Sequence, residues 1–317
     1  MDRRQFVTGM GAAWTLWGCG AAKPRSSAPG PKEAGRPKLG FAHGVASGDP
    51  LADRVILWTR ISPPSTDSIP VAWAIALDPQ MKRVVATGET TANSERDFTI
   101  KVDATGLVPN TTYFYQFSAG GLKSVVGRTK TLPVDRIDRL RLAFCSCSSL
   151  PWGFFNAYAN IAKRADIDAV LHLGDYIYEY ANETYGDGSD IGRIPIPNRE
   201  LVTLADYRIR HAQYKTDPDS QAMHRQHPVI AVWDDHELAN DAWMNGAENH
   251  DEGEGEWMQR RTAAAQAYLE WMPIREQSDA VEAKIYRSFR FGDLAHLNML
   301  DTRLIGRDQQ LPADAPG

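Results

Sequence analysis

Three apolar segments in the second half of the chain each run into side chains that can bind a metal ion. The first is followed by CSC (145–147), the second by GDYIYE (174–179) and the third by DDHE (234–237). A buried carboxylate is costly unless it is paired or binds a metal. Asp175 comes directly after a strongly apolar segment, so we expect it to need a cation.

The mixture of ligand types indicates which metals would fit. A set of thiolate, phenolate and carboxylate suits a transition metal such as ferric iron better than magnesium alone, with a second site built from oxygen ligands. Carboxylates can also bridge two metals about 3.5–4 Å apart, which is the spacing found in two-metal hydrolases. The chain contains neither a GxSxG nucleophile motif nor a GxxxxGK[ST] phosphate loop. Those absences argue against the main competing mechanisms, which use a serine nucleophile or a glycine-rich phosphate loop.

Alternating strands and helices are expected to position these groups. The predicted elements are strands at 139–146, 168–173 and 229–233, helices at 153–164, 207–214, 221–226 and 257–272, and paired strands at 285–291 and 294–300. This order predicts an α/β (α+β) sheet with ligands at the carboxyl ends of its strands. We assign residues 139–317 to this catalytic module.

A smaller all-β module is predicted before it, over residues 38–133. Runs of β-branched and aromatic residues predict strands at 55–59, 71–77, 98–102, 114–117 and 124–131. The segment LVPNTTY (107–113) matches the corner of fibronectin-like sandwiches, where the hydroxyl of a tyrosine, here Tyr113, bonds to upstream backbone. We therefore expect a fibronectin- or immunoglobulin-like β-sandwich that supports the site or controls access to it.

The first 22 residues have the pattern of a twin-arginine export signal. Arg3 and Arg4 precede a short uncharged run that is too short to span a bilayer. The segment LWGC (16–19) resembles a lipoprotein box, which would place a lipid anchor on Cys19, and cleavage after Ala22 is the alternative. Residues 23–37 are predicted to be a linker. We expect the twin-arginine (Tat) export machinery as a partner and a periplasmic or extracellular location, membrane-anchored if Cys19 is acylated.

The composition is that of an ordinary globular protein. The chain has 317 residues, of which 43% are hydrophobic and 24% charged, and a formal net charge of -5. This modest acidity provides no field that would attract nucleic acid or an anionic membrane, and we find no nucleic-acid-binding module. Three cysteines do not make a disulfide framework in a chain of this length. We expect a monomer.

Taken in order, the chemical motifs resemble the PhoD family of alkaline phosphatases and phosphodiesterases. The matching segments of the second module are FCSC (144–147), LGDYIYE (173–179), WDDHE (233–237) and LDTR (300–303). Upstream, HGVASGDP (43–50) and LWTR (57–60) resemble the N-terminal domain of that family. The resemblance covers nearly the whole chain after the signal. It implies a metallophosphatase core that holds ferric iron (Fe3+) and calcium (Ca2+) and acts on a phosphate-ester substrate.

The resemblance also implies roles for individual residues. Cys147 matches an iron-binding cysteine, Asp175 a bridging carboxylate, and Tyr178 a phenolate ligand. Asp235 stands where related metallophosphatases place an Asn or Asp ligand. For Asp234 three alternatives are open: a metal ligand, a hydrogen-bond partner of the neighbouring histidine, or a cap of a helix or turn.

Two residues are expected to act on the substrate rather than on a metal. His236 matches a histidine that contacts the phosphoryl group, and Arg303 matches an arginine near the phosphate. The implied mechanism is in-line attack on phosphorus by a metal-bound hydroxide, with the metals and Arg303 stabilising the phosphoryl charge. His236 would stabilise the transition state or protonate the leaving alkoxide.

Several other candidate ligands have a simpler structural interpretation. Cys145 and Cys147 are two residues apart and share one face of a strand, so we expect Cys145 to pack in the core. His172 is expected to be packed or to lie behind the ligands. The oxygen-rich run 248–256 is expected to be a solvated loop. The histidines expected at the surface are His211, His224 and His227.

Metallophosphatases of this architecture also carry a late Gly-Asp-x-His element, which we do not find. The segment GDLAH (292–296) has one residue too many and precedes LDTR. We therefore expect a C-terminally truncated chain with an incomplete catalytic domain. The expected function is an exported phosphoesterase of the alkaline phosphatase D type, which hydrolyses phosphate mono- and diesters. The alternatives are a phospholipase-D-like diesterase and, if the protein ends at Gly317, a non-catalytic phosphate- or metal-binding envelope protein.

Overall fold

The structure is a computed structural model that describes residues 39–62 and 68–311. The expected export signal at 1–22, with Cys19, and the expected linker at 23–37 lie outside the described residues. Among the helices of the described ranges, none combines the length and the apolar character needed to cross a membrane.

The largest sheet has six strands in the order β5-β2-β1-β11-β10-β9. Their bounds are Thr99–Thr105 (β5), Arg54–Arg60 (β2), Val45–Gly48 (β1), Pro228–Ala231 (β11), Ala169–His172 (β10) and Leu142–Cys145 (β9). β1, β11, β10 and β9 pair in parallel, whereas β2 is antiparallel to both of its neighbours. The carboxyl ends of β9, β10 and β11 therefore meet at one edge, where ligands of α/β sheets gather.

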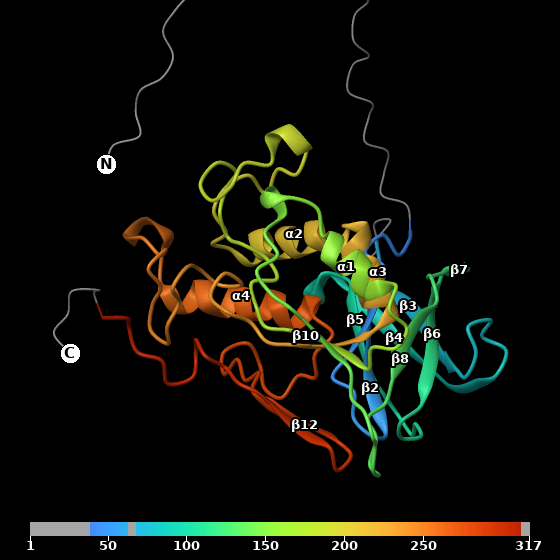
Figure 1. Ribbon diagram of the computed structural model, residues 1–317. Coiled ribbons are helices and arrows are strands. Elements are labelled where there is room, and N and C mark those ends of the chain that lie inside the picture. The colour runs from blue at the N-terminus through green and yellow to red at the C-terminus, as the bar shows by residue number, and fades with distance from the viewer. Residues whose placement is uncertain (1–38, 63–67, 312–317) are drawn as a thin grey trace, which may run out of the picture. The chain divides into compact units, whose positions relative to one another are not determined.

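Helices cover one side of this sheet and a hairpin lies on the other, as the labels around β10 in Figure 1 show. The helices are α1 (Asn156–Ala162), α2 (Leu204–Lys215), α3 (Pro218–Gln226) and α4 (Trp257–Trp271). The hairpin pairs β12 (Arg287–Phe291) with β13 (Ala295–Met299). Short 3-10 turns are η1 (Ser94–Arg96), η2 (Leu150–Trp152), η3 (Ser189–Ile191) and η4 (Glu252–Glu254). One continuous apolar cluster joins sheet, helices and hairpin, and includes Val170, Ile230, Tyr268 and Phe289.

Local signals explain where two of the covering helices begin. α2 starts with a capping box, in which the Thr203 hydroxyl accepts from the Asp206 N–H and the Asp206 carboxylate accepts from the Thr203 N–H. α3 starts with the Asp217 side chain accepting from two backbone N–H groups, followed by Pro218 at the first helical position. Both caps fix the residue at which the helix begins.

The expected β-sandwich is present. Its second sheet contains β4 (Val84–Asn93), β3 (Ser68–Ala76), β6 (Thr112–Ala119) and β7 (Leu122–Lys123), with β8 (Gly127–Lys130) also paired to β6. It packs on the β5-β2-β1 part of the large sheet through residues such as Leu57 and Phe117. The predicted tyrosine corner is confirmed, because the Val108 N–H donates to the Tyr113 hydroxyl at 2.8 Å.

The two modules share a sheet, which the sequence does not predict. β1 pairs with β2 on one side and with β11 on the other, with Gly48 opposite Val229. A Cβ on Gly48 would lie 2.1 Å from the Pro273 carbonyl oxygen, so only glycine fits this crossing. Next to it the buried Asp49 forms an ion pair with Arg287 of β12 at 2.6 Å. The other predicted strands and helices are all present, with shifted ends.

Candidate metal centre

A buried glutamate fastens the loop after β10 to the loop after β11. The Glu237 carboxylate accepts from the backbone N–H groups of Asp175 (3.0 Å), Tyr176 (2.6 Å) and Asp234 (2.9 Å). Burial, with a further contribution from Asp175, raises the pKa of Glu237 to about 8, against the lowering effect of these three donors. The Glu237 carboxylate therefore holds the two loops at these strand ends together.

The crossing of these loops leaves no room for a side chain at Gly174. Its φ is +107°, and a Cβ there would lie 2.3 Å from the backbone nitrogen of Asp234. The next residue, Asp175, also has a left-handed backbone with φ of 53°. Such conformations are unfavourable for residues other than glycine and persist only where the surroundings impose them. The local backbone is therefore shaped to present the Asp175 carboxylate.

Asp175, Asp235 and His236 form a group able to hold a metal ion. All three are buried, and each offers a ligand atom within 4.8 Å of the others. Asp175 Oδ1 is buried with no hydrogen-bond partner, whereas Oδ2 accepts from the Tyr178 hydroxyl at 3.2 Å. Burial, followed by the charges of Asp235 and Asp234 against that of His236, raises the pKa of Asp175. An unpartnered buried carboxylate oxygen among other carboxylates is the environment that a cation would satisfy.

A second buried glutamate orients His236. Its Nδ1 lies 2.8 Å from Glu179 Oε2, while Glu179 Oε1 accepts from the Asn240 N–H and the Asn249 side chain. Burial opposes the charged imidazolium, but the hydrogen bond and charge of Glu179, together with Asp235 and Asp175, raise the pKa of His236 to about 9. A cation bound here would oppose that negative field. Holding Nδ1 in this way fixes the ring and leaves Nε2 for other partners.

Arg303 reaches the same group from the segment after β13. Its Nε lies 2.5 Å from Asp234 Oδ1, and Nη2 lies 3.3 Å from Asp235 Oδ1. Nη1 is buried without a hydrogen-bond partner. In this arrangement Asp234 pairs with Arg303 and not with His236, whose partner is Glu179.

Cys147 and Tyr178 lie beside Asp175, close enough for their side chains to influence one another. The backbone N–H groups of Cys147 and Ser148 donate to the carbonyls of Gly174 and Asp175, which joins the loop after β9 to the site. Burial raises the pKa of the Cys147 thiol and, more strongly, that of the Tyr178 phenol. Neither would ionise by itself, so either would need a strongly polarising cation to become an anionic ligand.

The two residues expected to pack do so. Cys145 lies against the core with its Sγ 3.6 Å from the Leu171 carbonyl, and burial raises its pKa to about 12. His172 is fully buried, with Nε2 2.8 Å from the Tyr158 hydroxyl.

The expectation that three further histidines lie at the surface was wrong. His211, His224 and His227 are buried, because α2 and α3 turn these polar positions towards the protein interior. His224 Nε2 lies 2.9 Å from the buried amine of Lys215. His211 packs between Tyr268 and Trp271, at ring-centroid distances of 6.3 Å and 6.4 Å.

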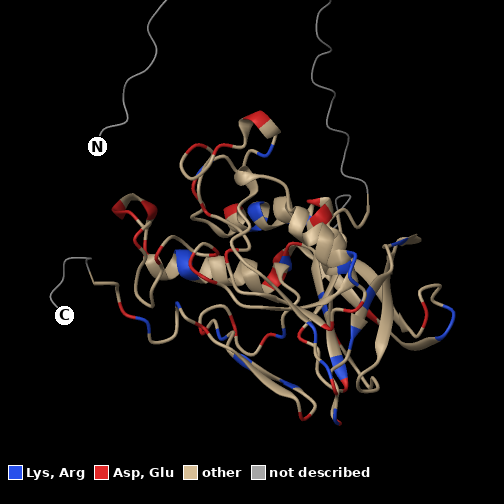
Figure 2. Cartoon of the chain, in the orientation of Figure 1, with Lys and Arg blue, Asp and Glu red and all other residues tan. Residues whose placement is uncertain are grey.

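The acidic run before α4 is more than a solvated loop. Figure 2 shows acidic positions gathered on this loop. Asn249 donates to Glu179, and Glu254 pairs with the buried Arg260 at 2.7 Å. The loop therefore supports the glutamate behind His236.

Reasoning from sequence missed Glu179 and Glu237 as site residues. Glu179 is the last residue of the motif at 174–179, and Glu237 is the last residue of the motif at 234–237. Their place in these motifs was the only signal that the sequence offered. The sequence does not distinguish a fully buried glutamate from one that is exposed to solvent. Only the fold shows that each accepts several donors.

Strand-end carboxylates, a histidine and an arginine converge at one edge of a mixed sheet, beside an N-terminal β domain, and define an α/β fold with a candidate metal site. Comparisons with known proteins agree. Residues 142–316 match the PhoD-like phosphatase family, and residues 25–133 match the N-terminal domain of PhoD-like phosphatases. The chain belongs to the PhoD-like phosphatase family.

Two relatives show how far the likeness extends. Alkaline phosphatase D of Bacillus subtilis (strain 168) is 38% identical over 321 residues, which covers 97% of this chain and 54% of that protein. A solved structure described as "Structure of PhoD" is similar with a TM-score of 0.80 at 38% identity, covering 88% of this chain and 54% of that one. The chain thus spans about half the length of the relatives it matches.

Proposed function

We propose that this chain belongs to an exported phosphoesterase that hydrolyses phosphate mono- and diesters in the manner of alkaline phosphatase D. The observation that carries the proposal is the buried, unpartnered Oδ1 of Asp175 beside Asp235 and His236. Membership of the PhoD-like phosphatase family supports the reaction class.

We propose ferric iron and calcium as the bound metals. Asp175, Asp235, Cys147 and Tyr178 would hold them, and Asp234 would join if its ion pair with Arg303 opened. The thiol and phenol favour iron, and the carboxylates suit either ion. Metals bound here would activate water and neutralise charge on the phosphoryl oxygens.

His236 and Arg303 would act on the phosphate ester. His236, held at Nδ1 by Glu179, would present Nε2 to a phosphoryl oxygen or to the leaving group. Arg303 has a buried Nη1 that forms no hydrogen bond and lies 3.8 Å from Asp241 Oδ1, and it would bind a phosphoryl oxygen through this atom. Because Arg303 also neutralises Asp234, substrate binding would compete with that ion pair.

The test is hydrolysis by the purified intact protein loaded with both metals. Metal content is measured by mass spectrometry, and turnover of p-nitrophenyl phosphate and bis(p-nitrophenyl) phosphate is followed. We expect hydrolysis that requires the metals and is at least about 100-fold slower in Asp175→Asn. Asp190→Asn, an exposed carboxylate in η3, is the matched control.

Other outcomes would select other functions. Both metals bound with no turnover of either ester would overturn the proposal. Tight phosphate binding without hydrolysis would favour a phosphate-binding envelope protein, and preference for phosphatidylcholine would select a lipid diesterase.

We further propose export of the protein by the twin-arginine route, as a monomer. Arg3 and Arg4 before a short uncharged run support this route, and Cys19 is the proposed lipid-bearing residue if the lipoprotein box is used. Replacing both arginines with lysine should retain the protein in the cytoplasm, as measured by cell fractionation.

A further inference from the structure

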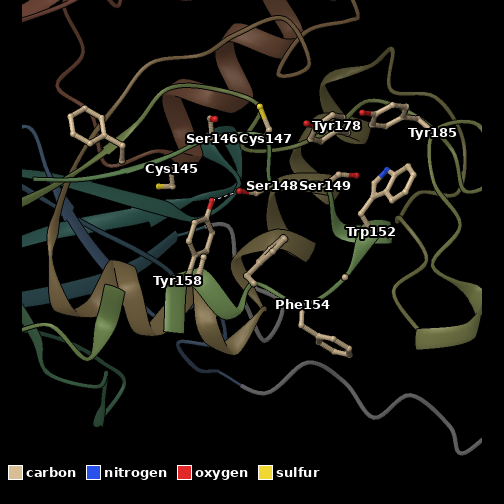
Figure 3. A pocket seen from close by; sticks show the side chains of 14 residues that line it. Cys145, Ser146, Cys147, Ser148, Ser149, Trp152, Phe154, Tyr158, Tyr178 and Tyr185 are labelled. Atoms are coloured by element: carbon tan, nitrogen blue, oxygen red, sulfur yellow. Dashed lines mark hydrogen bonds between the residues drawn. The ribbon is translucent and has the colours of Figure 1, made fainter. Parts of the chain in front are cut away.

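An uncharged pocket opens directly beside the candidate metal centre. Its volume is about 640 Å³, within the roughly 300–1,000 Å³ typical of small-molecule sites. Cys147 and Tyr178, which contact the metal-binding group, also line this pocket (Figure 3). Its lining consists of aromatic, serine, cysteine and small residues, and includes no Asp, Glu, Lys, Arg or His. The pocket is therefore continuous with the charged centre but opposite to it in character.

Four of the aromatic side chains that line it are exposed and form its outer wall. Trp152 is 67% exposed, Phe144 63%, Phe154 59% and Tyr185 45%. Figure 3 shows Trp152 beside Tyr185, with Phe154 further along the same pocket. Large aromatic rings that gather at the surface around a hollow commonly mark a binding site.

This wall is held in place despite its exposure. Trp152 and Tyr185 make an edge-on contact with centroids 5.9 Å apart, and Tyr185 stacks on Tyr178 at 5.6 Å and 13°. Gly186 packs so closely on Trp152 that a Cβ would lie 2.7 Å from the indole nitrogen. Rings already fixed in this way lose little conformational freedom on binding.

We propose that this pocket is a subsite for an uncharged aromatic group esterified to the phosphate. The inference rests on the proposed function, because it places the phosphoryl group at Asp175, Asp235 and His236. The aromatic group then lies against Trp152 and Tyr185, across Tyr178. A charged group would lose water here without gaining an ionic partner from the lining, so the pocket selects against it.

Calorimetry with four small probes separates the subsite from the metal centre. The metal-loaded chain is titrated with inorganic phosphate, 2-hydroxyethylphosphonate, (1-naphthyl)methylphosphonate and 1-naphthol, because the carbon–phosphorus bond of the phosphonates is not hydrolysed during the titration. We expect (1-naphthyl)methylphosphonate to bind about 10-fold more tightly than 2-hydroxyethylphosphonate. Trp152→Ala and Tyr185→Ala should each weaken (1-naphthyl)methylphosphonate by about 3- to 10-fold, and Trp152→Ala should leave inorganic phosphate unchanged. Tyr286→Ala, an exposed tyrosine outside the pocket lining, is the matched control.

The outcomes are distinguishable. If inorganic phosphate does not bind but 1-naphthol binds in a Trp152-dependent way, the subsite stands and the proposed function fails. If 1-naphthol and (1-naphthyl)methylphosphonate bind equally well to the parent chain and to Trp152→Ala and Tyr185→Ala, the subsite is overturned. Equal affinities for 2-hydroxyethylphosphonate and (1-naphthyl)methylphosphonate would overturn it as well.

Discussion

Glu179 shows how one side chain can serve a site without belonging to the group that would bind the metal. It has no exposed surface, and it accepts hydrogen bonds from the loop after β11 and from the acidic loop while contacting His236. Removal of a carboxylate that orients a ligand or catalytic histidine typically lowers metal affinity or activity by about 10- to 100-fold. Its role is to fix the His236 ring relative to Asp175 and Asp235.

Replacement of Glu179 should therefore loosen the site before it unfolds the protein. We expect Glu179→Ala to lower the rate of ester hydrolysis by about 10- to 100-fold, and Glu179→Gln to recover part of that loss. Turnover of p-nitrophenyl phosphate by the metal-loaded protein measures the effect, and the thermal midpoint reports whether the fold survives. Glu183→Ala, an exposed glutamate of the same loop, is the control. Unchanged turnover in a folded Glu179→Ala protein would remove Glu179 from the site.

At the scale of elements, the site depends on three strand-end loops that cross closely. The loop after β9 donates to the loop after β10, which in turn is fastened to the loop after β11 through Glu237. Gly174 lies at the tightest point of this crossing. Displacement of any one loop is therefore transmitted to the other two.

Adding one methyl group at this crossing should be costly. Gly174→Ala combines an unfavourable φ with a clash against the Asp234 backbone, and we expect it to lower the free energy of unfolding by about 2–4 kcal/mol. Gly106→Ala is the control, because Gly106 also has positive φ but open space around it, and should cost about 1 kcal/mol. Urea unfolding of both variants measures the difference. Equal losses would show that backbone strain alone, not the crossing, sets the cost.

The sequence predicted most elements but not how the halves join. Apolar runs such as 168–173 and 229–233 are strong signals because their strands are buried on both faces. The β1 segment, VASG, contains small residues with weak strand preference, and its conformation comes from pairing on both sides. β4 was also missed, since its polar, exposed positions resemble a loop.

The candidate site was predictable only where a motif follows a buried strand. Asp175, Asp235 and His236 come together because parallel strands deliver their ends to one edge, a rule that needs no structure. Arg303 was placed by resemblance, since nothing in its local sequence indicates contact with Asp234. The burial of His211 and His224 could not be predicted, because polar helix positions normally face water and here face a packed aromatic interior.

At the scale of the whole molecule, several basic side chains are buried between the large sheet and the helices that cover it. Lys215 has almost no exposed surface, and its amine lies over the rings of Trp58 and Tyr176. Burial lowers the pKa of Lys215 well below its usual range, and it lowers the pKa of His43, His172 and His211 to about 3. The three histidines are therefore neutral in the folded protein near pH 7.

The buried histidines should each destabilise the protein in acid. In the unfolded chain they take up protons near pH 6.5, while in the folded chain they stay neutral to about pH 3, so the unfolded state binds more protons between these values. Each of these histidines then removes stability as the pH drops below about 7, on the order of 1–2 kcal/mol at pH 5. His236 and Glu237, whose pKa values are raised to about 9 and about 8, act in the opposite direction over the same range. Urea midpoints of the parent protein from pH 8 to pH 5 therefore give the sum of both effects, and a single-histidine variant separates them.

One substitution isolates the contribution of a single histidine. Both ring nitrogens of His211 are buried without hydrogen-bond partners, with Lys215 and Arg210 as the charges acting on it. His211→Phe should raise stability and flatten the pH profile, because an apolar ring of similar shape takes up no proton. His296→Phe, at an exposed position of β13, should leave the profile unchanged. Parallel profiles for His211→Phe and the parent protein would contradict the prediction.

The position of β1 bears on how such proteins can be recombined. The two family matches end at 133 and begin at 142, which invites exchange of the N-terminal half between relatives. A chimera joined there would nevertheless bring together β1 and β11 from different parents along a hydrogen-bonded seam. Gly48 of one parent would have to fit against the carbonyls of Val229 and Pro273 from the other. The pairing of β1 with β11 therefore limits which halves can be combined, and both halves of a chimera should come from parents that match along this seam.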